Sequence, residues 1–582
     1  MNKSIFQNIS KVWRFISPNR KFQFKVLLIL MIFTTFFEIL SIGSILPFLS
    51  VITNPHTFFE IKTLKPVLIF FNINKSEDLI LVLTIIFCIA SIISAGMRIL
   101  YLNFSVRFSF LLGSDLSNEI YHKTLHQPYI VHISRNSSEI INGIWNKVSE
   151  VIFYVILPIT TLINSSILVI ILVPSLILII PKIALIAILG LIIIYIFFIN
   201  FTKYKLAANS EKIAKESDNV LKTLQEGLSG IRDVLIDNSQ FIFSKKYKDT
   251  NEILRRAQGN VQIISQIPRS ALEALGMILL ALVAYFMSKS QFGISVAIPS
   301  IAALALGLQR LLPNTQQLYS SWSTIKGAQS SLIDVVNLLE QPYPDNFLIN
   351  DIEIIKFNDT IKLTNISFKY KEASQFIFND FNLLIKKGSR VGFIGTTGCG
   401  KSTLLDILMG LLKPNKGSIF IDDVEITEYN LKNWQRHIAH VPQNVFLSDN
   451  SIRMNIAFGI PEEKIDHEKV KLAAKQAQLN DIIESWPMQY ETRVGERGVQ
   501  LSGGQCQRIG IARALYKNAD VIIFDEATSA LDQTTEKSVM DSIEMLSENI
   551  TLLIVAHRIN TLEKCTEIYE IKNGLLFNYF NK

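Results

Sequence analysis

A glycine-rich segment in the second half of the chain has the residue types and spacing that phosphate binding requires. Residues 395–403 read GTTGCGKST, after the apolar run 390–394 (RVGFI) and before an apolar helical stretch. The glycines let the backbone curl so that its N–H groups, and the N-terminus of the following helix, face phosphate oxygens. Lys401 can then reach the β and γ phosphates, and the Ser402 hydroxyl can ligate Mg²⁺. The loop therefore predicts a nucleoside triphosphate site.

The order of elements favours this interpretation over a purely structural glycine turn, because a phosphate-binding loop must connect a strand to a helix. The residues predicted to bind the nucleotide in this loop are Gly395, Thr396, Thr397, Gly398, Cys399, Gly400, Lys401, Ser402 and Thr403.

Two adjacent carboxylates follow a second apolar run. Residues 521–524 (VIIF) precede Asp525 and Glu526. A buried parallel strand would deliver these side chains at its carboxyl edge. There Asp525 is suited to hold Mg²⁺, directly or through water, and Glu526 to polarise an attacking water as general base. The pattern is weak alone and becomes informative beside the glycine loop.

The string LSGGQ, residues 501–505, lies between these two segments. One interpretation is a glycine turn in which Ser502 is the N-cap of a helix that continues to Tyr516. The full string is much rarer by chance than the Ser-Gly-Gly run. Ser502, Gly503, Gly504 and Gln505 are therefore candidates for a role beyond the helix cap.

The elements that must position these residues differ between the two halves of the chain. Its 582 residues are 49% hydrophobic and only 18% charged, which excludes a disordered, collagenous or disulfide-scaffold protein. Residues 1–340 contain 30 Lys and Arg against 19 Asp and Glu, a net charge of +11, whereas residues 341–582 contain 27 against 31, a net charge of −4. This change predicts a membrane domain, 1–340, followed by a cytosolic domain, 341–582, and nothing in it requires nucleic acid.

Six apolar stretches approach or exceed the length of about 20 residues that one membrane span needs. They are approximately 24–52, 79–106, 151–178, 183–200, 263–287 and 293–316. The third and fourth form a hairpin that turns near Pro181. A soluble helix pair is the alternative there, but residues 151–200 hold a single charge, Lys182. The expected fold class is an all-α six-helix transmembrane domain followed by an α/β P-loop nucleotide-binding domain.

Basic residues before the first apolar stretch, among them Lys11 and Arg14, place the N-terminus inside by the positive-inside rule. Six spans then return the chain to the same side, so both termini are expected in the cytoplasm, with the protein in a bacterial inner (plasma) membrane. The polar insertions 107–150 and 201–262 would face the cytosol and extend the membrane helices. Within the external segment 54–78, residues 61–73 either lie in the outer interface or form an ordinary loop.

Ionisable residues inside apolar stretches are costly unless they pair or line a cavity. Glu38 falls in the middle of the first stretch, and Arg98, Arg269 and Arg310 fall nearer the predicted cytosolic ends of theirs. Glu273 is four residues after Arg269 and can share its helical face. The three arginines are candidate ligands for a lipid pyrophosphate that enters from the cytosolic side. The alternative is that they only reach toward lipid headgroups.

The motifs, in this order, resemble those of ATP-binding cassette (ABC) proteins, and the whole chain is similar to an exporter-type half-transporter. The resemblance implies that Tyr370, in SFKY, stacks on adenine, and that Gln443, in VPQN, senses Mg²⁺ and the membrane domain. It also implies that His557, in AHR, reaches the γ phosphate. The implied catalytic residues are Glu526, His557 and Gln443, and the implied Mg²⁺ ligands are Ser402, Gln443 and Asp525.

The resemblance extends to two loops and to a partner. Residues 529–532 (SALD) match a loop that links opposed sites, and residues 493–498 (RVGERG) match an exporter-specific loop. The LSGGQ string is implied to act on ATP held by a partner cassette. Because the chain has one set of spans and one cassette, we expect a homodimer with two hydrolytically competent sites. ATP, bound together with Mg²⁺, would drive transport by alternating access.

The substrate is indicated only by short matches. Residues 307–313 (GLQRLLP) and 127–129 (QPY) resemble exporters of lipid-linked saccharides and related polysaccharide-cluster transporters. They imply export or flipping of a lipid-linked oligosaccharide or related glycolipid. Membrane lipids are the other expected partners. The alternatives are a peptide or bacteriocin exporter, a lipid A or drug exporter, and, in a different class, a nucleotide-gated channel or regulator. Glu526 argues against a channel, because a gate needs slow or absent hydrolysis at one site.

Overall fold

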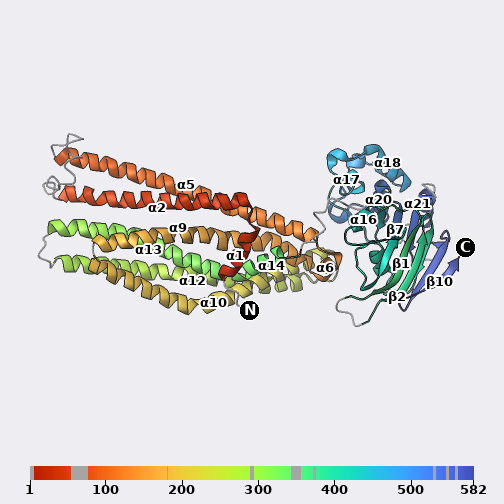
Figure 1. Cartoon of the computed structure of the whole chain (residues 1–582), viewed down its shortest axis with the longest axis horizontal. Coiled ribbons are helices and arrows are strands. Elements are labelled where there is room, and N and C mark those ends of the chain that lie inside the picture. Colours follow the sequence, from red (N-terminus) through yellow and green to blue (C-terminus); the bar gives the residue numbers. More distant parts are fainter. Residues whose placement is uncertain are drawn as a thin grey trace. The chain divides into compact units, whose positions relative to one another are not determined.

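The computed structural model describes residues 5–53, 76–179, 181–288, 294–342, 355–370, 375–527, 532–544, 549–556 and 562–581. The chain divides into two compact units (Figure 1). The first comprises residues 1–127 and 132–343, and the second comprises residues 128–131 and 344–582. Each unit is described by itself below.

The first unit is built from helices. They are α1 (Ile5–Phe15), α2 (Pro18–Thr53), α5 (Ser76–Leu125), α7 (Ser137–Asn142), the π-helix η1 (Gly143–Lys147), α8 (Val148–Val151), the π-helix η2 (Ile152–Ile156), α9 (Leu157–Ile179), α10 (Pro181–Ser229), α11 (Ile231–Ile236), α12 (Gln240–Ser288), α13 (Ile294–Gly327) and α14 (Gln329–Leu339). The short helix α6 (Tyr129–Ser134) begins in residues that belong to the second unit.

Four helical segments in the described part of the chain are long and apolar enough to cross a membrane. They are Pro18–Ser44, Asp78–Leu125, Ser137–Ser175 and Ile188–Ser229. They overlap the first four predicted spans, and α10 begins at Pro181, where we predicted the hairpin turn. Many side chains of the fifth and sixth predicted spans, on α12 and α13, lie outside the described residues, so these two spans stay predictions. The external apolar segment 61–73 lies outside them too.

Three helices of the first unit are much longer than a bilayer requires. α5 has 50 residues, and α10 and α12 have 49 each. At a rise of about 1.5 Å per residue such helices reach roughly 75 Å, against about 30 Å for the hydrocarbon core. The excess length is in the charged insertions, as we expected from their helical spacing.

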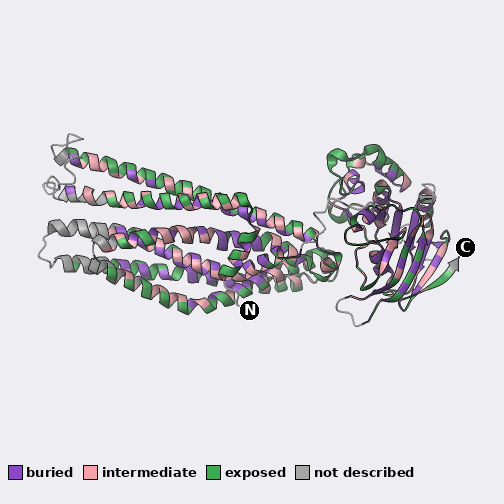
Figure 2. Cartoon of the chain, viewed as in Figure 1, coloured by how far each residue is buried: buried purple, intermediate pink, exposed green. Residues whose placement is uncertain are grey.

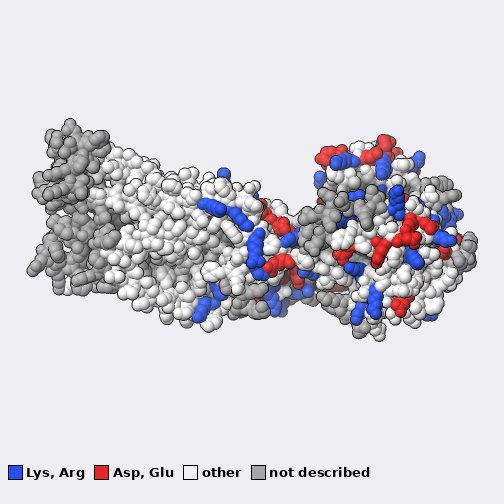
Figure 3. All heavy atoms as spheres, in the orientation of Figure 1, with Lys and Arg blue, Asp and Glu red and all other residues white. Residues whose placement is uncertain are grey.

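The surface of the first unit is apolar over much of its length. Large hydrophobic side chains such as Ile92, Ile99 and Ile193 are exposed, and Figure 2 shows exposed positions along α2, α5 and α10. In Figure 3 the visible Lys, Arg, Asp and Glu atoms of this unit gather toward the end where α14 lies. An exterior that is apolar over much of its length is what a lipid environment favours.

The charged end of this unit contains a buried cluster that sequence reasoning did not single out. Lys147 ends η1 and is only 5% exposed. Its Nζ lies 2.8 Å from a carboxylate oxygen of Asp218 on α10 and 2.8 Å from one of Asp334 on α14. Glu150 on α8 accepts a hydrogen bond of 2.5 Å from the Ser331 hydroxyl of α14. Lys147 thus connects three elements that are far apart in the sequence.

The second unit contains two sheets. The strands are β1 (Thr360–Phe368), β2 (Phe378–Lys386), β3 (Arg390–Ile394), β4 (Lys416–Ile421), β5 (Val424–Glu425), β6 (Ile438–Val441), β7 (Val521–Asp525), β8 (Thr551–Val555), β9 (Glu567–Lys572) and β10 (Leu575–Asn581). One sheet has the order β2-β1-β4-β5 with antiparallel pairs. The other has the order β10-β9-β3-β8-β7-β6 and is parallel from β9 to β6.

Helices pack against these sheets. They are α15 (Lys401–Leu408), α16 (Leu431–Arg436), α17 (Ile452–Ile456), the 3₁₀ helix η4 (Glu462–Lys464), α18 (His467–Gln476), α19 (Asn480–Glu484), the 3₁₀ helices η5 (Gln489–Glu491) and η6 (Glu496–Gly498), α20 (Gly503–Lys517) and α21 (Gln533–Glu544). The parallel strands are apolar runs because helices cover them, so β8 is buried at all five positions. Ile130 also packs against the core of this unit. The predicted α/β fold class is confirmed.

Candidate nucleotide-binding site and membrane charges

The glycine loop joins β3 to α15 in the order that phosphate binding requires. Gly395, Gly398 and Gly400 have φ of 153°, 82° and 104°. A Cβ on Gly395 would lie 2.6 Å from the backbone oxygen of Ile571, so glycine is needed there for both φ and space. The curl of the loop leaves the N-terminus of the eight-residue α15 behind it.

Lys401 begins α15 and folds back over the loop. Its Nζ donates hydrogen bonds to the backbone oxygens of Gly395 at 2.8 Å and of Thr396 at 3.2 Å, and the residue is 7% exposed. These carbonyl contacts hold the ammonium within the curl of the loop, where a bound phosphate would need it. Lys401 is therefore positioned over the loop by the loop's own backbone.

Strand register brings the acidic pair to the same sheet edge as the loop. Phe393 of β3 and Asp525 of β7 both pair with Val555 of β8, so the three strands end together. Burial raises the pKa of Asp525, and the Glu526 carboxylate acts in the same direction. A hydrogen bond from Ser402 and the charge of Lys401 oppose this rise. A carboxyl and a hydroxyl in contact at this edge are suitable ligands for Mg²⁺.

Glu526 is held in an unusual backbone conformation next to Gln443. Its φ is +51°, a left-handed value that is uncommon for a residue with a side chain. Its backbone N–H donates to the carbonyl of Val555 at 3.0 Å, and Gln443 Nε2 donates to Glu526 Oε2 at 2.6 Å. The structure thus brings together two residues that are 83 positions apart in the sequence. Gln443 follows β6, the neighbour of β7 in the parallel sheet.

Asp406 was missed by sequence reasoning. It lies on α15, and burial together with the Asp525 carboxylate raises its pKa to about 6. The position of an aspartate one turn into a helix is no signal by itself, because only the folded sheet edge brings Asp406 near Asp525. The acidic character of this edge is therefore larger than the sequence indicates.

Tyr370 contacts the helix that follows the glycine loop. Its hydroxyl lies 3.3 Å from Thr403 Oγ1, and its ring packs edge-on against Phe368 with centroids 5.2 Å apart. This contact places an aromatic face beside α15. Stacking of the Tyr370 ring on adenine stays a prediction.

The LSGGQ string forms the N-terminus of α20. Ser502 is its N-cap: the Ser502 hydroxyl accepts from Gln505 N at 3.3 Å, and Gln505 Oε1 accepts from Ser502 N at 2.8 Å. This reciprocal pair confirms the capping interpretation. Nucleotide binding by Ser502, Gly503, Gly504 and Gln505 stays a prediction. His557, which follows β8 by two residues, and residues 528–531 lie outside the described part of the chain.

The three candidate arginines, Arg98, Arg269 and Arg310, lie on three helices of the first unit and in different surroundings. Arg98 is exposed on α5. Arg269 on α12 pairs with Glu273 through an Nε–Oε1 distance of 2.9 Å, as their spacing predicted. Arg310 on α13 lies 3.5 Å from Glu38 Oε1 on α2, and the Glu38 side chain is only 7% exposed. The pairing of Arg310 with Glu38 was not foreseen, because it joins the first and the last long helices of this unit.

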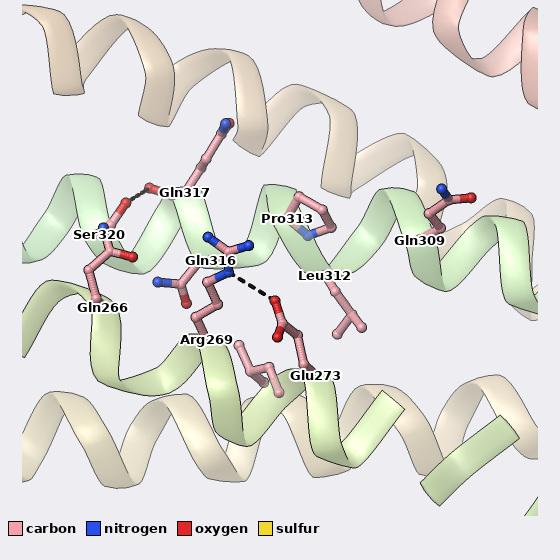
Figure 4. A pocket seen from close by; sticks show the side chains of 10 residues that line it. Gln266, Arg269, Glu273, Gln309, Leu312, Pro313, Gln316, Gln317 and Ser320 are labelled. Atoms are coloured by element: carbon pink, nitrogen blue, oxygen red, sulfur yellow. Dashed lines mark hydrogen bonds and ion pairs between the residues drawn. The ribbon is translucent and has the colours of Figure 1, made fainter. Parts of the chain in front are cut away.

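Arg269 lines a pocket of about 450 Å³ between α12 and α13. The lining residues, drawn in Figure 4, are Gln266, Arg269, Leu272, Glu273, Gln309, Leu312, Pro313, Gln316, Gln317 and Ser320. Arg98 and Arg310 do not line it. The three candidate arginines therefore do not meet in this pocket.

The fold and the site together define a membrane-type helical unit joined to an α/β unit with a phosphate loop. Comparison with known proteins agrees with this class. The family model of the ABC transporter transmembrane region matches residues 24–307, and that of the ABC transporter matches residues 378–529. The chain belongs to the ABC transporter family.

The relatives include bacterial proteins named as ATP-dependent lipid A-core flippases. The chain is 30% identical over 384 residues to the ATP-dependent lipid A-core flippase of Chromohalobacter salexigens, covering 65% of this chain and 64% of that one. It is 30% identical over 381 residues to the flippase of the same name from Legionella pneumophila, covering 65% and 63%. The chain thus spans less than two thirds of the length of either flippase.

A chloroplast protein and a solved exporter structure are also similar. ABC transporter B family member 29 of Arabidopsis thaliana is 34% identical over 291 residues, which are 49% of this chain and 45% of that one. The structure of a bacterial Atm1-family ABC exporter with ATP bound matches with a TM-score of 0.74 at 21% identity, covering 92% of this chain and 93% of the other. This similarity shows that the fold is that of an ABC exporter.

Proposed function

We propose that the protein is an ATP-driven exporter that moves a glycolipid across the bacterial inner membrane by alternating access. The observation that supports this most directly is the convergence of the glycine loop, Asp525 and Glu526 at one sheet edge. This edge belongs to a chain whose other unit is a helical bundle with an apolar exterior. A phosphate loop beside an acidic pair binds and hydrolyses ATP, and the bundle supplies a route through lipid.

In this proposal the side chains at the sheet edge have distinct roles. Lys401 and the loop N–H groups bind the phosphates, and Ser402 and Asp525 hold Mg²⁺, which neutralises phosphate charge when bound. Glu526 orients and deprotonates the attacking water, and Gln443 holds the Glu526 carboxylate through their 2.6 Å hydrogen bond. His557 would reach the γ phosphate, and Tyr370 would stack on adenine.

The protein is proposed to act as a homodimer. Ser502, Gly503, Gly504 and Gln505 at the N-terminus of α20 would contact ATP bound to the loop of the partner subunit, since a helix N-terminus favours anions. ATP that binds the closed dimer more tightly than the open one shifts the equilibrium toward closure. The long helices of the first unit would transmit this change, and hydrolysis would return the dimer to its open state. Both termini would be cytoplasmic.

The substrate is proposed to be an anionic glycolipid. A lipid-linked oligosaccharide and lipid A both belong to this class, and the names of the two bacterial flippases favour a lipid A-type glycolipid. Arg98, which is exposed, is the arginine whose surroundings suit contact with a phosphate, and Arg269 could take part only by leaving Glu273. Arg310 could take part only by leaving Glu38 for the substrate.

Translocation of a labelled glycolipid tests this function. The full-length protein is reconstituted in proteoliposomes that contain lipid A carrying a fluorescent group, and ATP-dependent movement between leaflets is followed by quenching. We expect movement with wild type and none with Glu526→Gln. Replacement of Arg98, Arg269 and Arg310 together by Gln should abolish stimulation of the ATPase by the glycolipid. The proposal would be contradicted if the protein hydrolyses ATP but moves neither lipid A nor a lipid-linked oligosaccharide, and if neither lipid stimulates its ATPase.

A further inference from the structure

The pocket between α12 and α13 has an unusual chemical lining. Four of its ten lining residues are glutamines, and one is a serine. Its charged members are Arg269 and Glu273, which pair with each other, so the lining has no net charge. Leu272, Leu312 and Pro313 supply an apolar wall. A neutral lining of amides with an apolar wall suits a group that has many hydroxyls and an apolar face.

The side-chain amide of Gln316 gives this lining a hydrogen-bond acceptor that has no donor among the described residues. The residue is 9% exposed, and its Nε2 donates to the backbone oxygen of Ser265 at 3.0 Å. Only the NH₂ group of an amide can donate to a carbonyl, so the identity of the two side-chain atoms is settled by this contact. Gln316 Oε1 is buried and accepts no hydrogen bond from any described residue. A buried acceptor without a donor is costly, and a ligand hydroxyl would satisfy it.

The position of Gln316 brings this acceptor next to the other polar groups. In Figure 4 its amide projects from α13 and lies beside Arg269 and Gln266, which project from α12. Gln266 is exposed, so its amide is available to a ligand in the pocket. A hydroxyl group that donates to Gln316 Oε1 would therefore lie within a set of further donors and acceptors.

We propose that this pocket binds the sugar part of the transported lipid, with Gln316 Oε1 accepting a hydrogen bond from a sugar hydroxyl. The inference rests on the proposed glycolipid function and refines it: the pocket selects the saccharide rather than the phosphate. A bare phosphate would meet the Glu273 carboxylate, and in its dianionic form it has no proton to donate to Gln316. The apolar wall then packs against the face of the sugar ring.

Equilibrium binding to the full-length protein in phosphatidylcholine nanodiscs tests the proposal. The probes are radiolabelled diglucosyl diacylglycerol, which has a neutral disaccharide, and radiolabelled phosphatidic acid, which has phosphate and no sugar. Gln316→Leu should weaken binding of the glycolipid by about 3- to 10-fold, the effect of one hydrogen bond to a neutral group, and leave binding of phosphatidic acid unchanged. Gln262→Leu, on α12 outside this pocket, is the matched control and should change neither.

Gln266→Leu gives a second measurement at an exposed position, where folding is not at risk. This substitution should also weaken glycolipid binding, by a smaller factor than Gln316→Leu does. Equal changes for both probes, no change in either variant, or wild-type binding of the glycolipid no tighter than that of phosphatidic acid would overturn the proposal. Selective glycolipid binding without any transport or ATPase stimulation would uphold the pocket and contradict the proposed function.

Discussion

In the second unit, the glycine loop and Gln443 follow strands and Asp525 ends one, and these strands end side by side. In the first unit, by contrast, Arg98, Arg269 and Arg310 lie on three helices in different surroundings. The glycine loop, Asp525 and the three arginines were selected from the sequence by their residue types and positions, whereas Gln443 was implied only by the resemblance to ABC proteins. The parallel sheet brings its set together because β3, β8, β7 and β6 share a direction and an edge.

The helical unit has no such shared edge. A residue on a long helix can face lipid, a neighbouring helix or the interior, and its depth along the axis decides little about its neighbours. Arg310 therefore pairs with Glu38 across two helices, and Arg269 pairs within its own helix. The comparison shows that motifs at strand ends predict a site, whereas charges on long helices predict only the need for a partner.

The largest expected effect is at Glu526. Glu526→Gln removes the proposed base and keeps the size and the hydrogen-bonding capacity of the side chain. Steady phosphate release should fall by at least about 100-fold, the range of general base catalysis, while ATP binding is retained. Phosphate release by the purified protein and equilibrium binding of labelled ATP measure the two effects. Glu463→Gln, at an exposed position of η4, is the control; phosphate release at the wild-type rate from Glu526→Gln would refute the assignment.

The next effect tests how firmly charge pairs hold the helical unit. Lys147→Met leaves the carboxylates of Asp218 and Asp334 without their shared cation in a partly buried site. Because these carboxylates are 28% and 36% exposed, we expect a loss of about 2 kcal/mol, below the range for fully buried pairs. The thermal unfolding midpoint of the purified protein measures this loss.

The control for that substitution is Lys11→Met, which removes a more exposed ion pair with Glu340. It should cost no more than about 1 kcal/mol. If the two substitutions lower the midpoint equally, the buried position of Lys147 has no special importance.

A smaller effect distinguishes the arginines from one another. Arg310→Gln leaves Glu38 buried without its cation and should destabilise the protein by about 1–2 kcal/mol, and a second change, Glu38→Gln, should restore most of the loss. Arg98→Gln, at an exposed position, should change the unfolding midpoint little. Equal midpoints for the two arginine variants would show that the 3.5 Å pairing contributes nothing to stability.

The smallest effect is a pH dependence in the second unit. Burial acts to raise the pKa of Asp422, but hydrogen bonds from the backbone N–H groups of residues 358–360 lower it below its ordinary value overall. A folded-state pKa below the unfolded one adds stability above the unfolded pKa, about 4, and this stability is lost as pH falls through the folded pKa. Asp422→Asn tolerates the left-handed φ of 45° and removes only the charge.

The cost of Asp422→Asn should be at most about 1 kcal/mol at pH 7, because the residue is partly exposed to solvent, and should shrink below pH 4. Unfolding midpoints of wild type and variant between pH 3 and pH 7, taken at the transition of the second unit, measure the difference. A difference that stays constant over this range would contradict the role of the charge.

Sequence reasoning predicted the phosphate loop, the acidic pair and the helix cap of Ser502 because each is a local pattern whose neighbours in the chain are its neighbours in space. It also predicted the Arg269–Glu273 pair, which needs only one helical turn. It missed Asp406, Lys147 and the partner of Arg310, since each depends on a contact between elements that are far apart in the sequence.

The sequence by itself therefore determined the class of protein, through apolar stretches long enough for a bilayer and a glycine loop whose spacing and context favour phosphate binding. The tertiary structure decided which groups meet. Strand order placed Gln443 against Glu526, helix packing gave Glu38 its cation, and the approach of α12 to α13 left Gln316 with an unsatisfied oxygen beside an ion pair. Local periodicity encodes which elements form, but the pairing of polar groups between elements depends on the depth and rotation of each helix, and only the packed structure sets these.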